Sequence, residues 1–200
     1  MADIRIGFAL TGSFCTFKAV FPQMELLVQK GYRVTPIMSP NAYTTDTRFG
    51  AAADWVGRAE EITGNPVIHT IAQAEPIGPK KLLDLLIIAP CTGNTLGKLA
   101  CGIYDTAPTL AVKSHRRNNG PVLIAVSTND ALASSAASIG MLMGRGCTLC
   151  PTGRTIPRAN RAAVWRILRR SFRRLRRRWR ADNSSLLFFK GWEEKNCMIR

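Results

Sequence analysis

Apolar runs alternate with segments of helical periodicity along the first 150 residues of the chain. In the run at residues 85–89, Leu-Leu-Ile-Ile-Ala, every residue is apolar, which is typical of a parallel strand covered by helices on both faces. Similar runs predict strands at residues 4–10, 32–38 and 122–126, with a short one at 67–71. Helical spacing predicts helices at residues 15–29, 46–63, 94–102, 106–117 and 130–143. This alternation predicts an α/β fold: a Rossmann-like or flavodoxin-like, doubly wound parallel sheet in three α/β/α layers.

Four loops follow the carboxyl ends of the predicted strands, where sheets of this kind bind ligands. They are Thr11-Gly12-Ser13, Ser39-Pro40-Asn41, the run from Pro90 to Thr95 and the run from Ser127 to Asp130. All four are rich in hydroxyls, amides and glycine, which together with N–H groups at helix N-termini bind phosphate monoesters. The loops therefore indicate a nucleotide-like site. In the alternative interpretation, Ser13, Asn94 and Asp130 are ordinary helix N-caps.

Other functional classes are less compatible with the sequence. The chain has no Gly-x-Gly-x-x-Gly loop and no Gly-Lys-Ser/Thr loop, so the usual dinucleotide and ATP signatures are absent. Cys147 and Cys150 form a Cys-x-x-Cys pair without a second pair, and we expect no metal site. The chain starts with a short segment that includes Asp3, unlike a signal peptide, and has no apolar run of about 18 residues. We therefore expect a cytoplasmic protein with reduced thiols and no membrane partner.

Several motifs occur in the same order as in a known family. They are Gly7-Phe8-Ala9-Leu10-Thr11-Gly12-Ser13, Thr47-Arg48-Phe49-Gly50, Ala89-Pro90-Cys91-Thr92-Gly93-Asn94-Thr95 and Ala125-Val126-Ser127-Thr128-Asn129-Asp130. Over about residues 4–143 the chain resembles the family of the B subunit of dipicolinate synthase, FMN-binding flavoproteins related to Cys-peptide and phosphopantothenoylcysteine decarboxylases.

The resemblance implies a role for each loop in binding FMN. Gly12 and Ser13 would hold the phosphate. The residues around the phosphate and the ribityl chain would be Ser39, Thr92, Asn94 and Thr95. Ser127 and Thr128 would approach the isoalloxazine.

The resemblance also implies an oxidoreductase component that works with the A subunit of dipicolinate synthase. Together they would oxidise dihydrodipicolinate to dipicolinate in the mother-cell cytoplasm of a sporulating bacterium. The flavin would supply the redox chemistry and the protein would position it. Catalytic residues are left unassigned. Because the related flavoproteins are trimers or dodecamers, we expect a homo-oligomer.

Two segments with histidines allow more than one interpretation. Lys113, His115, Arg116 and Arg117 lie at the end of a predicted helix. They form either a basic last turn that complements the helix dipole or a site for a dicarboxylate or the partner subunit. His69 falls in the predicted strand at 67–71 and is interpreted as a core or edge histidine. A second function, decarboxylation of a cysteine-containing substrate, ranks lower, because the family's decarboxylases use a histidine on a helix and a C-terminal substrate segment.

The net charge of +15 is concentrated in the last fifty residues. Residues 151–200 contain 15 Lys and Arg against 3 Asp and Glu, with 12 arginines from Arg154 to Arg180. We therefore divide the chain into a flavoprotein domain, 1–146, and an Arg-rich tail, 147–200. One interpretation of the tail is a basic amphipathic helix for RNA, DNA or an anionic membrane. Non-specific polyanion binding is expected whatever its origin.

The genetic code favours a second interpretation, in which the tail is translated out of frame. The resembling family continues with Val-Pro-(Phe/Tyr)-Gly-Gln-Asp-Asp-Pro, which is missing from this chain. Read from the third base of the Leu149 codon, the codons allowed for residues 150–157 permit Val-Pro-Tyr-Gly-Gln-Asp-Asp-Pro. A frameshift near residues 144–146 predicts that the last strand is lost. The strand at 122–126 would then have an uncovered edge, and we expect instability and poor flavin binding.

Overall fold

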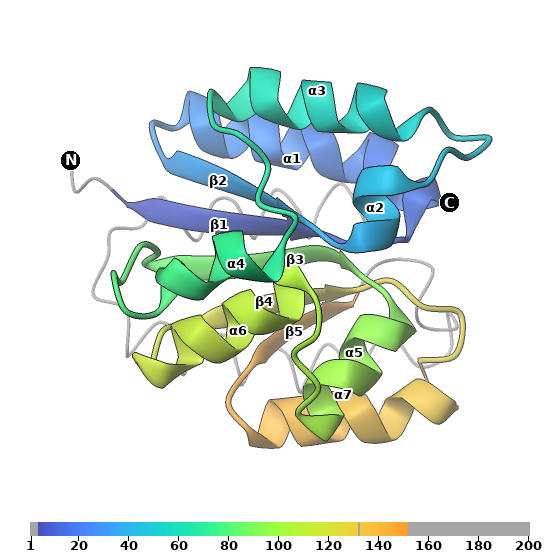
Figure 1. The fold of residues 1–200 in the computed structure, drawn as a ribbon. Coiled ribbons are helices and arrows are strands. Elements are labelled where there is room, and N and C mark those ends of the chain that lie inside the picture. The colour runs from blue at the N-terminus through green and yellow to red at the C-terminus, as the bar shows by residue number, and fades with distance from the viewer. Residues whose placement is uncertain (1–3, 132, 152–200) are drawn as a thin grey trace.

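A five-stranded, all-parallel sheet forms the centre of the computed structural model, which describes residues 4–131 and 133–151 (Figure 1). The strands are β1 (Arg5–Leu10), β2 (Arg33–Met38), β3 (Leu85–Cys91), β4 (Val122–Val126) and β5 (Thr148–Pro151). Their order, β2-β1-β3-β4-β5, is that of a flavodoxin-like sheet, with the reversal between β1 and β3. The predicted fold class is confirmed.

Burial along the strands follows the apolar pattern of the sequence. All seven residues of β3, the middle strand, are buried, as its continuous apolar run predicts. Pro36 lies in β2, where it pairs with Phe8 of β1. β2 is at the edge of the sheet, and no further strand pairs with its outer side. A proline is tolerated there because its missing N–H breaks no hydrogen bond to a neighbouring strand.

Helices cover both faces of the sheet (Figure 1). They are α1 (Phe17–Gln29), α2 (Pro40–Thr44), α3 (Ala52–Thr63), α4 (Ile71–Ala74), α5 (Gly93–Cys101), α6 (Ala107–Arg117) and α7 (Ser134–Gly144), with 3₁₀ turns η1 (Phe14–Thr16) and η2 (Glu75–Ile77). The first three helices contribute to one hydrophobic cluster, and α4 to α7 contribute to the cluster on the opposite face. Gly31, with φ of 81°, ends α1, as its position in the sequence predicts.

Two predicted elements are wrong in detail. The helix predicted at 46–63 begins only at Ala52, and Phe49 lies in the loop before it. The strand predicted at 67–71 is reduced to a single bridge between Ile68 and Ile37. Thr70 instead caps α4, because its side chain accepts a hydrogen bond from the Gln73 N–H and the Gln73 side chain bonds back to the Thr70 N–H.

The predicted loss of the last strand is also wrong. Residues 148–151 form β5, which runs parallel to β4 with Leu149 opposite Ile124 and Pro151 opposite Val126. Thr148, Leu149 and Cys150 are buried. The edge of β4 is therefore covered, and β5 belongs to the sheet although it lies beyond the predicted domain boundary at residue 146. The rest of the Arg-rich tail, residues 152–200, lies outside the described residues.

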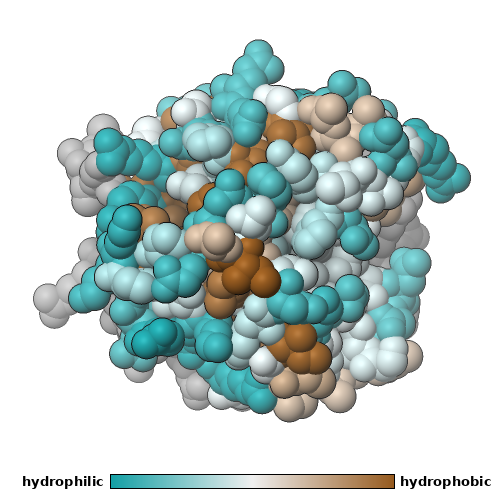
Figure 2. Space-filling view, viewed as in Figure 1, coloured by the Kyte–Doolittle hydropathy of each residue, from teal (hydrophilic) through white to brown (hydrophobic). Residues whose placement is uncertain are grey.

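The surface in this view is mainly hydrophilic, with apolar spots scattered among the polar side chains of both helix layers (Figure 2). Four large apolar side chains are exposed in the described part of the chain: Ile71, Leu82, Ile103 and Met141. Single exposed apolar residues are normal on soluble domains. No helix in the described ranges is long and apolar enough to cross a membrane.

Candidate functional site

Hydrogen bonds between loops join the carboxyl ends of three strands. The Thr11 hydroxyl, after β1, donates to the Pro90 carbonyl of β3 at 2.8 Å and accepts from the Thr92 N–H at 3.0 Å. The hydroxyls of Ser13 and Ser127 lie 2.8 Å apart and link the loops after β1 and β4. The structure thus brings Ser13, Thr92 and Ser127 to one edge of the sheet, next to the point where strand order reverses.

None of the three residues in the N-cap interpretation caps a helix with its side chain, although Ser13 occupies the N-cap position of η1. Ser13 makes no side-chain cap hydrogen bond. Thr92, rather than Asn94, caps α5, since its hydroxyl accepts from the Thr95 N–H at 3.3 Å. The N-cap of α7 is Ala133, not Asp130.

Ser39, like Thr92, serves as a helix cap in addition to lying at this edge. Its side chain accepts a hydrogen bond from the Ala42 N–H at 3.3 Å at the start of α2. The Ser39 N–H donates to the carbonyl of Leu10, the last residue of β1. The β2 loop is thereby tied to the β1 loop, and the hydroxyl hydrogen of Ser39 remains available as a donor.

The first turn of α5 presents N–H groups and hydroxyls together. Its N–H groups have no partners within the helix, and the helix dipole makes this end partly positive. The Thr92 and Thr95 hydroxyls lie 3.1 Å apart, with Thr95 buried and Asn94 exposed. At Gly93, a Cβ would lie 3.1 Å from both the Ser135 Oγ and the Thr128 Oγ1. The close approach of the Thr128 and Ser135 hydroxyls to the start of α5 therefore depends on glycine at this position.

Asp130 is an anchor that the sequence interpretation missed. Its carboxylate accepts hydrogen bonds from the hydroxyls of Ser134, Thr128 and Ser135. These bonds, that of Ser134 first, lower the pKa of Asp130 to about 2. Because the Thr128 hydroxyl hydrogen is directed at Asp130, Thr128 can offer a ligand only its oxygen or its backbone groups. The sequence signal that could have revealed these hydrogen bonds is the presence of three hydroxyl residues close to an aspartate.

His69 differs from the prediction because it lies between the Ile68 bridge and the Thr70 cap, outside any strand. The Met38 N–H, at the end of β2, donates to the Ile68 carbonyl, which places His69 beside the carboxyl end of that strand. Its ring stacks on Tyr43 of α2, with centroids 3.8 Å apart and planes 5° apart. His69 is partly exposed. Its neighbour in space, Tyr43, was not visible as a partner in the sequence.

The four loops at the carboxyl edge of the sheet are called the loop cluster below. The structure places the basic residues at the end of α6 away from it: Lys113, His115, Arg116 and Arg117. They lie in the second half of α6, which leads to the amino end of β4 and so to the opposite edge of the sheet. His115 is 3% exposed, and its Nε2–H donates to the Pro121 carbonyl at 3.0 Å. Burial lowers the His115 pKa. Arg116 donates to the Arg145 carbonyl, and the Lys113 ammonium lies 5.0 Å from the Tyr104 ring centroid. The end of α6 and the four loops therefore lie at opposite edges of the sheet.

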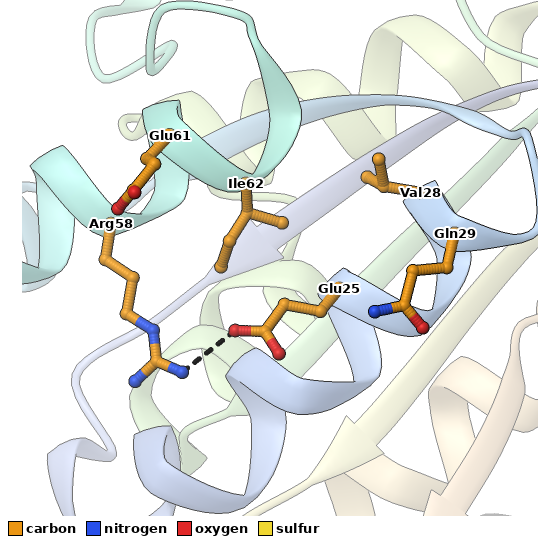
Figure 3. Close-up of a pocket in the computed structure, with 6 residues that line it drawn as sticks. All are labelled: Glu25, Val28, Gln29, Arg58, Glu61 and Ile62. Carbon is orange, nitrogen blue, oxygen red and sulfur yellow. Dashed lines mark hydrogen bonds and ion pairs between the residues drawn. The ribbon is translucent and has the colours of Figure 1, made fainter.

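A groove of about 280 Å³ lies between α1 and α3 (Figure 3). Arg58 of α3 points toward Glu25 of α1, and their side chains form an ion pair of 2.9 Å across it. Glu61 adds a second carboxylate, and none of the predicted site residues lines the groove. Because carboxylates repel phosphate, this groove does not suit the ligand that the loops indicate.

Comparisons with known proteins give a consistent result. The family model described as Flavoprotein matches residues 1–153. The B subunit of dipicolinate synthase of Bacillus subtilis (strain 168) is 49% identical over 139 residues, which are 70% of each chain. The crystal structure of the B subunit of dipicolinate synthase from Bacillus halodurans superposes with a TM-score of 0.63 at 42% identity, covering 72% of this chain and 74% of that one.

A more distant structure shares the fold alone. The FMN-dependent cysteine decarboxylase TvaF of thioviridamide biosynthesis has a TM-score of 0.60 at 22% identity, covering 85% of this chain and 98% of that one. The match of the Flavoprotein model to most of the sequence agrees with the flavodoxin-like sheet and the loops at its carboxyl edge. The chain therefore belongs to the Flavoprotein family.

Proposed function

We propose that this chain is the flavoprotein component of a dipicolinate synthase, which works with the A subunit of that enzyme in oxidising dihydrodipicolinate to dipicolinate. The observation that carries the proposal is the 49% identity to a protein named as the B subunit of dipicolinate synthase, over 70% of each chain. The proposal includes FMN as the cofactor, a homo-oligomeric assembly and a place in the cytoplasm of a sporulating cell.

The loop cluster fits a phosphate monoester such as that of FMN. Its donors are hydroxyls and the N–H groups at the start of α5, which suit a phosphate. The hydroxyls of Ser13 and Ser127 are 2.8 Å apart, close enough for both to contact the same phosphate group. The one carboxylate of the four loops is that of Asp130, and hydrogen bonds from three hydroxyls stabilise its negative charge.

These contacts refine the expected residue roles. We assign Gly12, Ser13 and Ser127 to the phosphate end of FMN, so Ser127 moves from the isoalloxazine side because it contacts Ser13. Ser39, Thr92, Asn94 and Thr95 keep their proposed places around the phosphate and the ribityl chain. Thr128 is proposed to face the ring side through its oxygen or backbone. Bound FMN would supply the redox chemistry, while these residues bind and orient it.

Reconstitution tests the proposed function. The purified chain loaded with FMN is mixed with the A subunit of the enzyme, a nicotinamide cofactor and dihydrodipicolinate, and dipicolinate formation is followed. We expect faster formation than with the A subunit alone, and a slower rate when Ser13→Ala and Asn94→Ala weaken FMN binding. A rate that is the same with or without this chain contradicts the proposal.

A specific observation also favours the second candidate, decarboxylation of a cysteine-containing substrate. The decarboxylase ranked low in part because His69 was predicted to lie in a strand. In the structure His69 lies outside any strand, immediately before the cap of α4, and its ring stacks on Tyr43. The test is carbon dioxide release from a Cys-terminated peptide, with His69→Gln as the matched variant. Release that His69→Gln abolishes supports the decarboxylase. No release from the FMN-loaded chain removes this candidate.

A further inference from the structure

A four-residue hairpin, Thr47–Gly50, lies between α2 and α3 and is held by its own hydrogen bonds. The Thr47 N–H donates to the Gly50 carbonyl at 3.1 Å, and the Gly50 N–H donates to the Thr47 carbonyl at 3.0 Å. The Phe49 N–H donates to the Thr47 hydroxyl at 3.2 Å. At the base, the Ala52 N–H donates to the Asp46 carboxylate at 2.8 Å, which fixes the hairpin to the first turn of α3.

Gly50 allows the hairpin to pack closely against Trp55. Its φ of 143° is a conformation that other residues rarely adopt, and a Cβ there would lie 2.9 Å from the Trp55 Nε1. The Trp55 indole packs edge-on against Phe17, with ring centroids 5.3 Å apart. The ring of Phe17 in turn packs on that of Phe14, the residue after Ser13, with ring centroids 5.4 Å apart. Aromatic contacts thus connect the hairpin to the loop that carries Ser13.

The hairpin presents one cation and one aromatic ring. The Arg48 guanidinium carbon lies 4.9 Å from the centroid of the Phe49 ring. Arg48 is exposed, and within the described ranges no carboxylate forms an ion pair with it. Phe49 is partly exposed and belongs to neither hydrophobic cluster. Packing of the core therefore does not account for this pair.

The position of the hairpin indicates a function for Arg48 and Phe49. The connection between α2 and α3 projects at the end of the sheet where β1, β3 and β4 end (Figure 1). The four loops at that edge contain no Lys or Arg, so they offer hydroxyls and N–H groups but no cationic side chain. Arg48 supplies a positive charge at this edge, on a support that hydrogen bonds and Gly50 hold in place.

We propose that Arg48 and Phe49 recognise a carboxylate on a planar ring of the substrate. The guanidinium binds a carboxylate through two parallel hydrogen bonds, and an aromatic face contacts the ring that bears it. Contact with Phe49 orients Arg48 before the ligand arrives. The inference rests on the proposed function for the substrate class, a ring dicarboxylate, and adds the residues that would select it.

Calorimetric titration of the FMN-loaded chain with pyridine-2,6-dicarboxylate tests the inference. We expect Arg48→Ala to weaken binding about 10- to 100-fold, as loss of charge-assisted hydrogen bonds does. Arg48→Lys keeps the charge but loses the two-point geometry, and we expect it to weaken binding as well. Lys80→Ala is the matched control, because it removes one exposed positive charge far along the chain from the hairpin. Succinate corrects for non-specific binding of dianions to the arginines of residues 154–180.

The outcomes separate the inference from the proposed function. Selective loss in the Arg48 variants, with unchanged FMN content and unchanged binding by Lys80→Ala, supports the inference. If the parent chain binds the pyridine dicarboxylate and Arg48→Ala binds it equally well, the inference is overturned and the proposed function stands. If the parent chain does not distinguish this ligand from succinate, both the substrate class and the inference are wrong.

Discussion

His115 makes the stability of the protein depend on pH at the scale of a single residue. Burial disfavours the charged imidazole and lowers its pKa, while the hydrogen bond to the Pro121 carbonyl opposes this shift in part. In the unfolded chain the imidazole titrates near its usual pKa of about 6.5. As the pH falls below that value, the unfolded state binds a proton that the folded state does not, so the free energy of unfolding decreases.

Replacing His115 tests this linkage. We expect the parent chain to lose more unfolding free energy between pH 7.5 and 5.5 than His115→Gln, with a limit of about 1.4 kcal/mol for each pH unit. Urea unfolding at the two pH values measures the difference. Asp84, whose pKa is lowered by its hydrogen bond with Arg5, titrates below this range and does not interfere. Equal pH dependence in the two proteins contradicts the account of His115.

At the scale of elements, the hairpin before α3 gives a matched pair of glycine substitutions. Gly50→Ala places a methyl group 2.9 Å from the Trp55 Nε1 at a φ of 143°. We expect it to lower the free energy of unfolding by about 1–3 kcal/mol. Gly57→Ala lies inside α3 with nothing within 4 Å and should raise stability by up to about 1 kcal/mol.

Denaturant unfolding of both variants measures these opposite effects. Because Gly50 also supports Arg48, the dicarboxylate affinity of Gly50→Ala should fall, whereas that of Gly57→Ala should not change. If Gly50→Ala is as stable as the parent chain, the hairpin is not held by its contact with Trp55.

The elements that the sequence predicts well are those with a strong local pattern. The apolar run at 85–89 predicts a buried strand, and residues 122–126 coincide with β4. The start of α3 was missed because Asp46 fixes its first turn from six residues before Ala52, without helical periodicity between them. β5 was missed because it is short, lacks the family motif expected after it and depends on pairing with β4, which buries Leu149 and Cys150.

The same limit applies to the candidate site. The four loops were predictable because parallel strands bring their carboxyl ends to one edge. The contact between Ser13 and Ser127 joins residues 114 positions apart, and no local pattern indicates it. The stack of Tyr43 on His69 is likewise a long-range contact. Resemblance to a family supplied the identity of these positions, and the structure supplies their partners.

At the scale of the whole molecule, β5 divides the predicted tail into two parts. A chain that ends after residue 151 keeps all four residues of β5, whereas a chain that ends after residue 146 loses the strand and exposes the edge of β4. We expect the shorter chain to melt at a clearly lower temperature. Thermal unfolding followed by circular dichroism measures this difference, and equal melting temperatures contradict a structural role for β5.

The same two chains test the binding of polyanions. Both lack the 12 arginines from Arg154 to Arg180, and we expect both to lose the salt-sensitive RNA affinity of the full chain. RNA affinity that persists after either truncation places the polyanion site elsewhere. The out-of-frame origin of residues 152–200 stays a proposal, and sequencing the gene across the codons for residues 140–170 tests it directly.

Comparison of FMN with riboflavin tests whether the loop cluster holds the phosphate of FMN. Riboflavin lacks the phosphate but keeps the ring and the ribityl chain, so the ratio of the two dissociation constants isolates the phosphate contacts. We expect the parent chain to prefer FMN, and Ser13→Ala with Ser127→Ala to weaken FMN binding about tenfold or more for each lost contact. Riboflavin affinity should be unchanged, and Ser114→Ala in α6 serves as the control. Equal affinities of the parent chain for FMN and riboflavin, or a double variant that keeps the full preference for FMN, contradict the assignment of the site.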